Sequence, residues 1–261
     1  DIFIEDGRAL LGHEFVETSL RTASRQIDAV GTDRNRAALG IDARGLLVLP
    51  GIVDLHGDAF ERQMMPRPGV DFPIDVALAD SDRQAISNGI TTVFHATTWS
   101  WEPGLRSGDN ARRLLETIEQ MRPKLAADTR FHLRHETYNL EAEPRIAKWM
   151  AAGRIDLLAF NDHMDSTVGD LAKPQKRSRM VERTGLTSQA FDQLVARVVA
   201  RAHDVPASID RLAEAARAAG VRMLSHDDQT PDMRARFRAQ GVGIAEFPVN
   251  EKTAREAAQA G

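Results

Sequence analysis

An imidazole and a carboxylate stand two residues apart at the end of an apolar run. His56 and Asp58 close the segment LVLPGIVDLHGD, residues 47–58, and we predict that its apolar part is a buried strand. Side chains alternate between the two faces of a strand, so those of His56 and Asp58 point the same way and can bind one metal ion together. An apolar strand that runs into His-x-Asp therefore indicates a hydrolytic metal site.

Imidazole and carboxylate groups also follow other apolar runs of the chain. They are His132, Arg134, His135 and Glu136 in FHLRHE, Asp162 and His163 in NDHM, and His226, Asp227 and Asp228 in LSHDD. Such donors suit a divalent transition metal such as Zn or Mn, and a carboxylate between two ions can bridge them. A single histidine at a strand end is more often structural or solvated, so the prediction depends on the recurrence of histidine at several strand ends.

Some of these groups are expected to support the site rather than to bind the metal. Asp162, Asp227 and Asp228 are interpreted as groups that orient ligand histidines, although Asp162 could instead cap the loop that follows it. His132 is expected to point to the opposite face of the strand from His135 and is assigned to the core or to a supporting position. His95 is expected to end a strand and to form hydrogen bonds inside the site.

The elements that must position these groups are strands alternating with helices. Candidate strands span roughly 47–56, 90–96, 130–136, 155–161, 221–226 and 242–247. Apolar residues recur at helical spacing in 109–125 and 188–202. Gly89, Gly153, Gly220 and Gly241 each stand between a helical segment and an apolar run, where a glycine can close a helix in the left-handed conformation.

This alternation predicts an α/β fold with a parallel sheet. The chain supplies about six strands, whereas a closed (β/α)8 TIM-like barrel needs eight. Residues 256–261 again resemble the end of a helix before a further strand, so we expect the chain to be part of a longer protein whose last barrel strands follow. A doubly wound open sheet of six strands is the alternative. Residues 1–45 alternate short apolar and polar stretches, with turn signals at Asp6-Gly7, Gly12 and Gly31, and predict a small β-rich layer.

Composition excludes several functional classes. The chain has 261 residues and no cysteine, which removes disulfides, thiolate metal sites and cysteine nucleophiles. The net charge of −4 argues against bulk nucleic-acid binding, and no apolar run approaches the ~18 residues of a membrane span. The acidic N-terminal segment is not a signal peptide. We therefore expect a cytoplasmic protein with no nucleic-acid or membrane partner.

The motifs as a group resemble the amidohydrolase superfamily, in which a β-sandwich flanks a metal-dependent barrel. The first-strand motif LPGIVDLHGD is typical of the whole superfamily. The segments PRPGVDFP, LSHDD and IAEFP, together with HGDAFERQMM, SNGITTVFHA and FHLRHE, are similar to its triphosphate diphosphatases of phosphonate metabolism. The resemblance implies a β-sandwich portion over 1–48 and a barrel over 49–261.

The resemblance also implies a ligand set. His56 and Asp58 would bind the more buried of two ions, Glu136 would bridge, and His163 and His226 would bind the second. Zn is the expected metal, with Mn, Fe or Ni as alternatives. An aspartate at the end of the eighth strand would act as ligand and general base, so the catalytic residue is expected beyond residue 261.

The implied reaction is hydrolysis of a ribose 1-methylphosphonate 5-triphosphate, in which an activated water attacks the α-phosphorus and pyrophosphate leaves. A triphosphate requires cationic donors. The candidates are Arg62 and Arg67 after the first-strand motif, Arg134 beside the proposed bridge, and Lys176 and Arg177 in the segment LAKPQKRSR, 171–179, which we interpret either as a phosphate-gripping loop or as a solvated basic segment.

Two other functions are compatible with the same residues. A C–N hydrolase of the superfamily, a deaminase or a cyclic amidohydrolase, would use the same metal ligands, although the PRPGVDFP segment and the basic segment favour a phosphorylated substrate. A non-catalytic relative would be expected to lack ligands, yet all those expected in this region are present. The sequence does not determine the oligomeric state, and a homodimer is the commonest assembly.

Overall fold

The computed structural model describes residues 1–32, 39–67 and 69–260. Part of the predicted β-rich region, 33–38, and Pro68 of the PRPGVDFP segment lie outside the described residues. The chain forms two compact units, Asp1–Ile52 and Val53–Gly261.

The first unit is a small β-sheet. Its strands are β1 (Ile2–Leu11), β2 (Glu14–Ala23), β3 (Gln26–Val30), β4 (Leu39–Asp42) and β5 (Leu47–Val48). The order is β3-β2-β1-β4, with β5 pairing parallel to β1 beyond β4. Gly12 turns the chain between β1 and β2, as predicted, but Asp6-Gly7 is not a turn. These two residues lie inside β1, where the register with β2 shifts and Asp6 has a φ of 53°.

The predicted single buried strand over 47–56 is wrong. Leu47–Val48 belongs to the sheet of the first unit, and a separate strand, β6 (Ile52–Gly57), begins the sheet of the second. The break falls at Leu49-Pro50-Gly51, where Pro50 has no N–H to donate to a ladder. The side chains of Ile52 and Val53 are more than half exposed. The apolar run is therefore a connection between two sheets.

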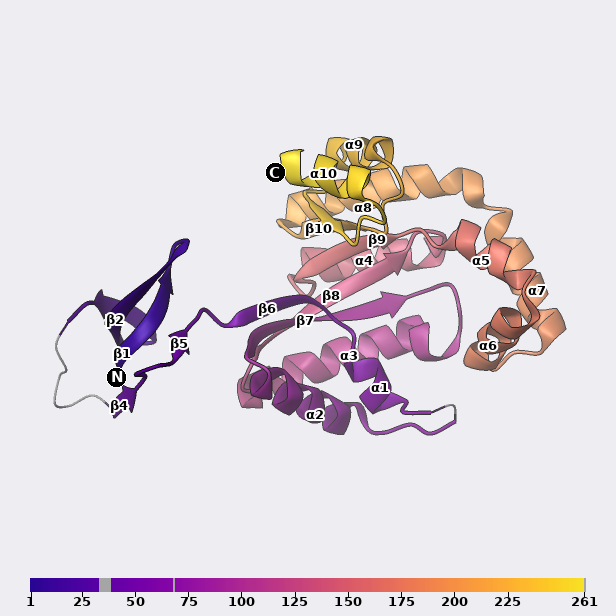
Figure 1. Ribbon diagram of the computed structural model, residues 1–261. Coiled ribbons are helices and arrows are strands. Elements are labelled where there is room, and N and C mark those ends of the chain that lie inside the picture. The colour runs from indigo at the N-terminus through magenta and orange to yellow at the C-terminus, as the bar shows by residue number, and fades with distance from the viewer. Residues whose placement is uncertain (33–38, 68, 261) are drawn as a thin grey trace. The chain divides into compact units, whose positions relative to one another are not determined.

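The second unit contains a six-stranded sheet, in which β6 to β10 are labelled in Figure 1. After β6 come β7 (Ile90–Trp99), β8 (Asp128–Glu136), β9 (Leu157–Asn161), β10 (Arg222–His226) and β11 (Ile244–Glu246). The order is β11-β10-β9-β8-β7-β6, and each pairing from β7 to β11 is parallel. All six predicted strand positions are thus occupied, but β7 continues to Trp99 and places His95 in mid-strand.

Helices connect the strands of this sheet. They are α1 (Phe60–Met64), α2 (Ile74–Ser87), α3 (Gly108–Met121), α4 (Glu143–Ala151), α5 (Met164–Leu171), α6 (Pro174–Thr184), α7 (Ser188–Val199), α8 (Val205–Ala219), α9 (Pro231–Ala239) and α10 (Glu251–Ala260). The four predicted helix-closing glycines all have positive φ. Gly220, for example, follows α8 with φ 68° and ψ 20°, a left-handed C-cap.

The strand order distinguishes between the two predicted sheet architectures. A doubly wound sheet reverses its strand order at a switch point. Here each successive strand is added at the same edge, from β6 to β11, which is the winding of a barrel. The alternative of a doubly wound sheet is therefore wrong, and the described part is a curled, barrel-like sheet of six parallel strands.

The two faces of the sheet bury different side chains. One face packs on the helices through a large apolar core that includes Phe131, Leu133, Leu158 and Phe160. The inner face carries a smaller apolar cluster of Leu157, Ala159 and Leu224, against which Phe94 and Ile244 pack. These inner residues alternate with the outer ones along each strand. Polar side chains follow them on the inner face toward the C-terminal ends of the strands.

Candidate metal centre

Three strands bring a group of metal-binding side chains together on the inner face. His56 is on β6, and His226 and Glu246 are the last residues of β10 and β11. Nδ1 of His56 lies 2.7 Å from Oε1 of Glu246, and Nε2 of His226 lies 3.8 Å from Oε2 of Glu246. One donor atom from each residue lies within 4.8 Å of the others. This spacing allows the three side chains to hold one ion.

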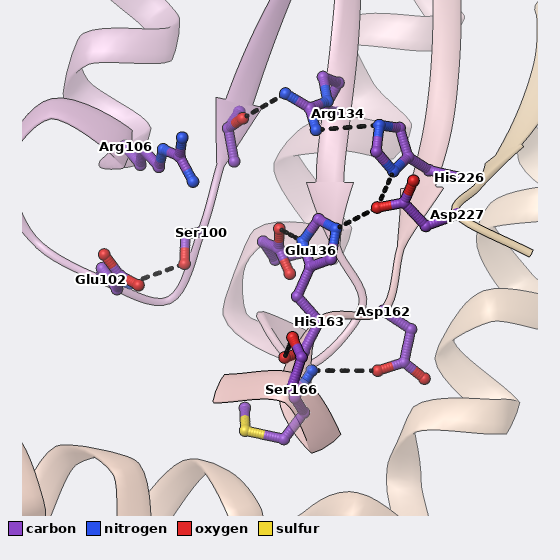
Figure 2. Close-up of polar contacts among 12 residues, drawn as sticks. Ser100, Glu102, Arg106, Arg134, Glu136, Asp162, His163, Ser166, His226 and Asp227 are labelled. Atoms are coloured by element: carbon purple, nitrogen blue, oxygen red, sulfur yellow. Dashed lines mark hydrogen bonds and ion pairs between the residues drawn. The ribbon is translucent and has the colours of Figure 1, made fainter. Parts of the chain in front are cut away.

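A second group shares His226 with the first. It consists of His163, His226 and Asp227, whose donor atoms also lie within 4.8 Å of one another. Oδ2 of Asp227 is 3.3 Å from Nε2 of His163 and 3.1 Å from Nδ1 of His226, so this carboxylate stands between the two imidazoles (Figure 2). Asp227 has a φ of 54°, an uncommon conformation for a residue other than glycine, which turns its side chain into the site.

Two further expected ligands lie beside these groups. Oδ2 of Asp58 is 3.8 Å from Nε2 of His56, and its side chain is 59% exposed, so it faces the rim rather than the interior. Oε1 of Glu136 is 2.7 Å from Nδ1 of His163 (Figure 2). This hydrogen bond fixes the orientation of the His163 ring, as a carboxylate does for many ligand histidines.

The donor set fits a divalent metal ion. Imidazole nitrogens and carboxylate oxygens are the ligands that zinc and related ions take in proteins. Oε2 of Glu246 is buried and makes no hydrogen bond to any described residue. Buried polar atoms are rarely left unsatisfied, so this carboxylate oxygen suits a cationic partner.

The protonation states favour metal binding at His226. Burial, followed by the positive charge of Arg134, lowers the pKa of His226 to about 3. A neutral imidazole is the form that binds a metal. Burial opposes ionisation of Glu246, but its hydrogen bond with His56 and the nearby imidazoles keep the pKa of this carboxyl below its usual range. For His163, the hydrogen bond with Glu136 raises the pKa.

Arg134, a predicted substrate contact, is buried inside the site rather than exposed at its rim. Its side chain is 8% exposed, and its guanidinium donates to Oγ1 of Thr98 at 3.3 Å and to Nε2 of His226 at 3.1 Å (Figure 2). With the amide of Asn161 in its favourable orientation, Arg134 also donates to the carboxamide oxygen at 3.0 Å. Burial and the nearby charge of Arg106 lower the pKa of Arg134. Arg134 therefore holds the inner wall of the site.

The other predicted cationic contacts are either exposed or paired with aspartates. Arg62 on α1 and Arg67 in the following segment are exposed. Nζ of Lys176 is 2.7 Å from Asp170, and Arg177 donates to both carboxylate oxygens of Asp192. The interpretation of 171–179 as a loop is wrong, because α5 extends to Leu171 and α6 begins at Pro174.

The three predicted supporting aspartates have separate surroundings. Asp227 belongs to the second metal-binding group itself, as described above. Asp162 accepts the backbone N–H of Met164 at 3.4 Å at the start of α5, which matches the capping alternative. Asp228 is fully buried and accepts a 2.5 Å hydrogen bond from Ser225, and Nε of Arg234 lies 3.5 Å from its carboxylate. This buried network holds the turn that carries His226 and Asp227.

The remaining strand histidines divide between the two faces. His132 lies on the inner face, where Nδ1 contacts the carbonyl oxygen of Leu55 at 2.8 Å and the ring stands near that of His56. His135 faces the helices, so the two histidines lie on opposite faces as predicted, but His135, one of the candidate metal-binding groups, is the one turned away from the site. His95 is buried on the helix side against Phe60, so the expectation that it forms hydrogen bonds inside the site is wrong. Burial lowers the pKa of His95, His132 and His135 to about 4 in each case.

An open cavity lies beside the second metal-binding group. Its volume is about 660 Å³, and its lining includes His163, Asp227, Asp162 and Arg236. That volume falls in the range of small-molecule sites, roughly 300–1,000 Å³. The site can therefore admit a small molecule to the side chains of the second group.

Glu246 is the residue of the site that the sequence reasoning did not single out. It stands in the quoted segment IAEFP, where a carboxylate closes a short apolar run just as His226 does in LSHDD. A search for any ionisable residue at a strand end, rather than for histidine above all, would have included it.

The chain resembles known proteins in sequence and in fold. The chain is 28% identical over 266 residues to α-D-ribose 1-methylphosphonate 5-triphosphate diphosphatase of Escherichia coli strain K12, a match that covers 99% of this chain and 68% of that protein. No protein-family model matches the chain.

Two solved structures of D-hydantoinase from Bacillus sp. AR9 share the fold. One aligns with a TM-score of 0.50 at 16% identity, over 97% of this chain and 61% of its own. The other aligns with a TM-score of 0.50 at 15% identity, over 94% of this chain and 56% of its own. The chain therefore spans less than two thirds of each hydantoinase chain. Together these similarities confirm the resemblance to the amidohydrolase superfamily and the expected barrel fold.

Proposed function

We propose that this chain forms the metal-binding part of a hydrolase that releases pyrophosphate from a ribose 1-methylphosphonate 5-triphosphate. The observation that carries a hydrolytic function is the pair of histidine–carboxylate groups that share His226 at the C-terminal edge of the sheet. The choice of substrate is supported by the name of the E. coli relative, which resembles the chain along 99% of its length.

The residues of this chain have separable roles in the proposal. His56, His226 and Glu246 would hold one divalent ion, with Asp58 at the rim, and His163 with Asp227 would hold a second. Bound ions of this kind polarise a phosphoryl oxygen and lower the pKa of a water molecule. Glu136 orients His163 through the 2.7 Å hydrogen bond, and we propose that its carboxylate also lies between the two positions.

Arg134 supports the site from the inner face of the sheet. Arg134 lies 3.1 Å from Nε2 of His226, and burial together with the charge of Arg134 keeps that imidazole neutral. Arg62 and Arg67, exposed after β6, are proposed contacts for the phosphorylated sugar. Lys176 and Arg177 are weaker candidates because Asp170 and Asp192 neutralise them.

No helix among the described residues is long and apolar enough to cross a membrane.

The proposal is tested by offering the metal-loaded full-length protein the sugar triphosphate and following phosphorus NMR. Pyrophosphate together with a sugar monophosphate is the expected pair of products. Release of inorganic phosphate alone, or turnover of cyclic amides in its place, would assign the site to another reaction.

A further inference from the structure

A single cationic side chain lines the cavity beside the second metal-binding group. The lining includes Asp162, Asp165 and Asp227, and among the described residues that line it Arg236 is the only arginine or lysine. Arg236 lies on α9, directly after the turn that carries His226 and Asp227. A polyanion that enters this cavity meets three carboxylates and one guanidinium.

Arg236 also has its charge available. The other basic residues near this edge, Lys173 and Lys176, both contact Asp170, and Arg177 pairs with Asp192. Arg238, on the same helix as Arg236, pairs with Glu256. The structure shows no ion pair of Arg236 within the described ranges, and its side chain is exposed at the cavity.

A second cavity shares Arg236 with the first. This cavity, about 360 Å³, also has Asp162 and Met233 in common with it. The rest of its lining is mostly apolar and includes Val205, Ile209 and Phe237, with Tyr138 and Gln240 as polar members. Arg236 therefore stands where a polar cavity next to the metal-binding group meets a mostly apolar one.

We propose that Arg236 binds the departing phosphates of the substrate, and so determines specificity for a polyphosphate over a neutral substrate. The inference rests on the proposed pyrophosphate release. A guanidinium can donate two parallel hydrogen bonds to phosphate oxygens. When Arg236 contacts the far end of the triphosphate, the α-phosphorus lies on the side of His163 and Asp227. This is where we propose that hydrolysis occurs.

The test measures binding of inorganic triphosphate to the metal-loaded full-length protein by titration calorimetry. The variants are Arg236→Gln, Arg236→Lys and the control Arg238→Gln, which removes the same charge from the same helix but not from the cavity. We expect Arg236→Gln to weaken binding about 10-fold or more and Arg238→Gln to change it by no more than about twofold. Arg236→Lys should recover part of the loss because it restores the charge without the two-pronged geometry.

A second readout separates this inference from the reaction on which it rests. In turnover of the sugar triphosphate, Arg236→Gln should raise KM more than it lowers kcat, with the thermal unfolding midpoint unchanged. Equal weakening of triphosphate binding in Arg236→Gln and Arg238→Gln would overturn the assignment, because only long-range charge would then matter. If the wild type releases no pyrophosphate, the reaction is wrong, whereas a selective loss of triphosphate binding in Arg236→Gln would still establish the anion contact.

Discussion

Nδ1 of His56 lies 2.7 Å from Oε1 of Glu246, although the two residues are on the opposite edge strands of the six-stranded sheet. In a flat sheet, five strand spacings would separate those edges by about 24 Å. Side chains can meet across that span only if the sheet curls. The contact therefore connects the barrel-like curvature directly to the metal-binding group at its inner face.

Replacing Glu246 tests its part in that group. Glu246→Gln keeps the shape of the side chain and removes its charge, so metal affinity should fall at least about 10-fold. Competition with a zinc chelator measures the affinity, and Glu251→Gln on the exposed surface of α10 is the charge-matched control. Unchanged zinc affinity in Glu246→Gln would exclude this carboxylate from the site.

The shared position of His226 predicts an unequal effect of two histidine variants. His226→Ala removes a donor from both groups, whereas His163→Ala leaves the group of His56, His226 and Glu246 intact. After dialysis, elemental analysis should therefore find less metal per chain in His226→Ala than in His163→Ala. Equal metal content in the two variants would show that the groups do not share this ligand.

These features were predictable from the sequence to different degrees. The alternation of helices and apolar runs is local, so the strand positions and helix-closing glycines such as Gly220 could be predicted. Pro50-Gly51 is a local signal for a break in the strand, but only tertiary pairing assigns Leu47 and Ile52, which are equally apolar, to different sheets.

The site shows the same division between local and tertiary information. His56, His163 and His226 follow apolar runs, and the order of parallel strands brings them together. Glu246 also follows a predicted apolar run, but only its contact with His56 from the opposite edge strand identifies it as part of the site. Lys176 is neutralised by Asp170 because α5 and α6 meet at a short junction. The basic composition of that segment gave no sign of this pairing.

An ion pair between helices should stabilise the second unit in a pH-dependent way. Glu143 on α4 accepts hydrogen bonds from Arg211 and Ser208 on α8, and the bond from Arg211 is the main cause that lowers the pKa of Glu143. Because the folded pKa is depressed, this contribution is present above the unfolded value near 4.5 and is lost as the pH falls through the folded value.

The corresponding variant is Glu143→Gln. We expect a loss of about 1 kcal/mol in the free energy of unfolding at pH 7, and a smaller loss below pH ~4. Urea denaturation at the two pH values measures both. A loss that stays the same at low pH would attribute the effect to packing rather than to the carboxylate charge.

Burial of His95 on the helix side predicts a second loss of stability on acidification, at a higher pH than that of Glu143. Burial lowers the pKa of His95 from 6.5 to about 4, so below pH 6.5 the unfolded chain gains a proton that the folded chain does not. Stability should therefore fall as the pH decreases from 6.5 toward 4.

A His95→Gln variant should show a smaller decrease in its thermal unfolding midpoint between pH 7 and pH 5 than the wild type. The solvent-exposed His203→Gln is the matched control and should leave the pH dependence as it is in the wild type. An identical decrease in wild type and His95→Gln would show that other groups determine the acid sensitivity.

The most direct test of the proposed function is the product of a single reaction. The metal-loaded full-length protein is incubated with ribose 1-methylphosphonate 5-triphosphate, and phosphorus NMR follows the products, with His226→Ala as the variant that lacks the shared ligand. The proposed function predicts pyrophosphate and a sugar monophosphate from the wild type and neither from His226→Ala. An unchanged triphosphate in the presence of folded, metal-occupied wild-type protein would contradict it.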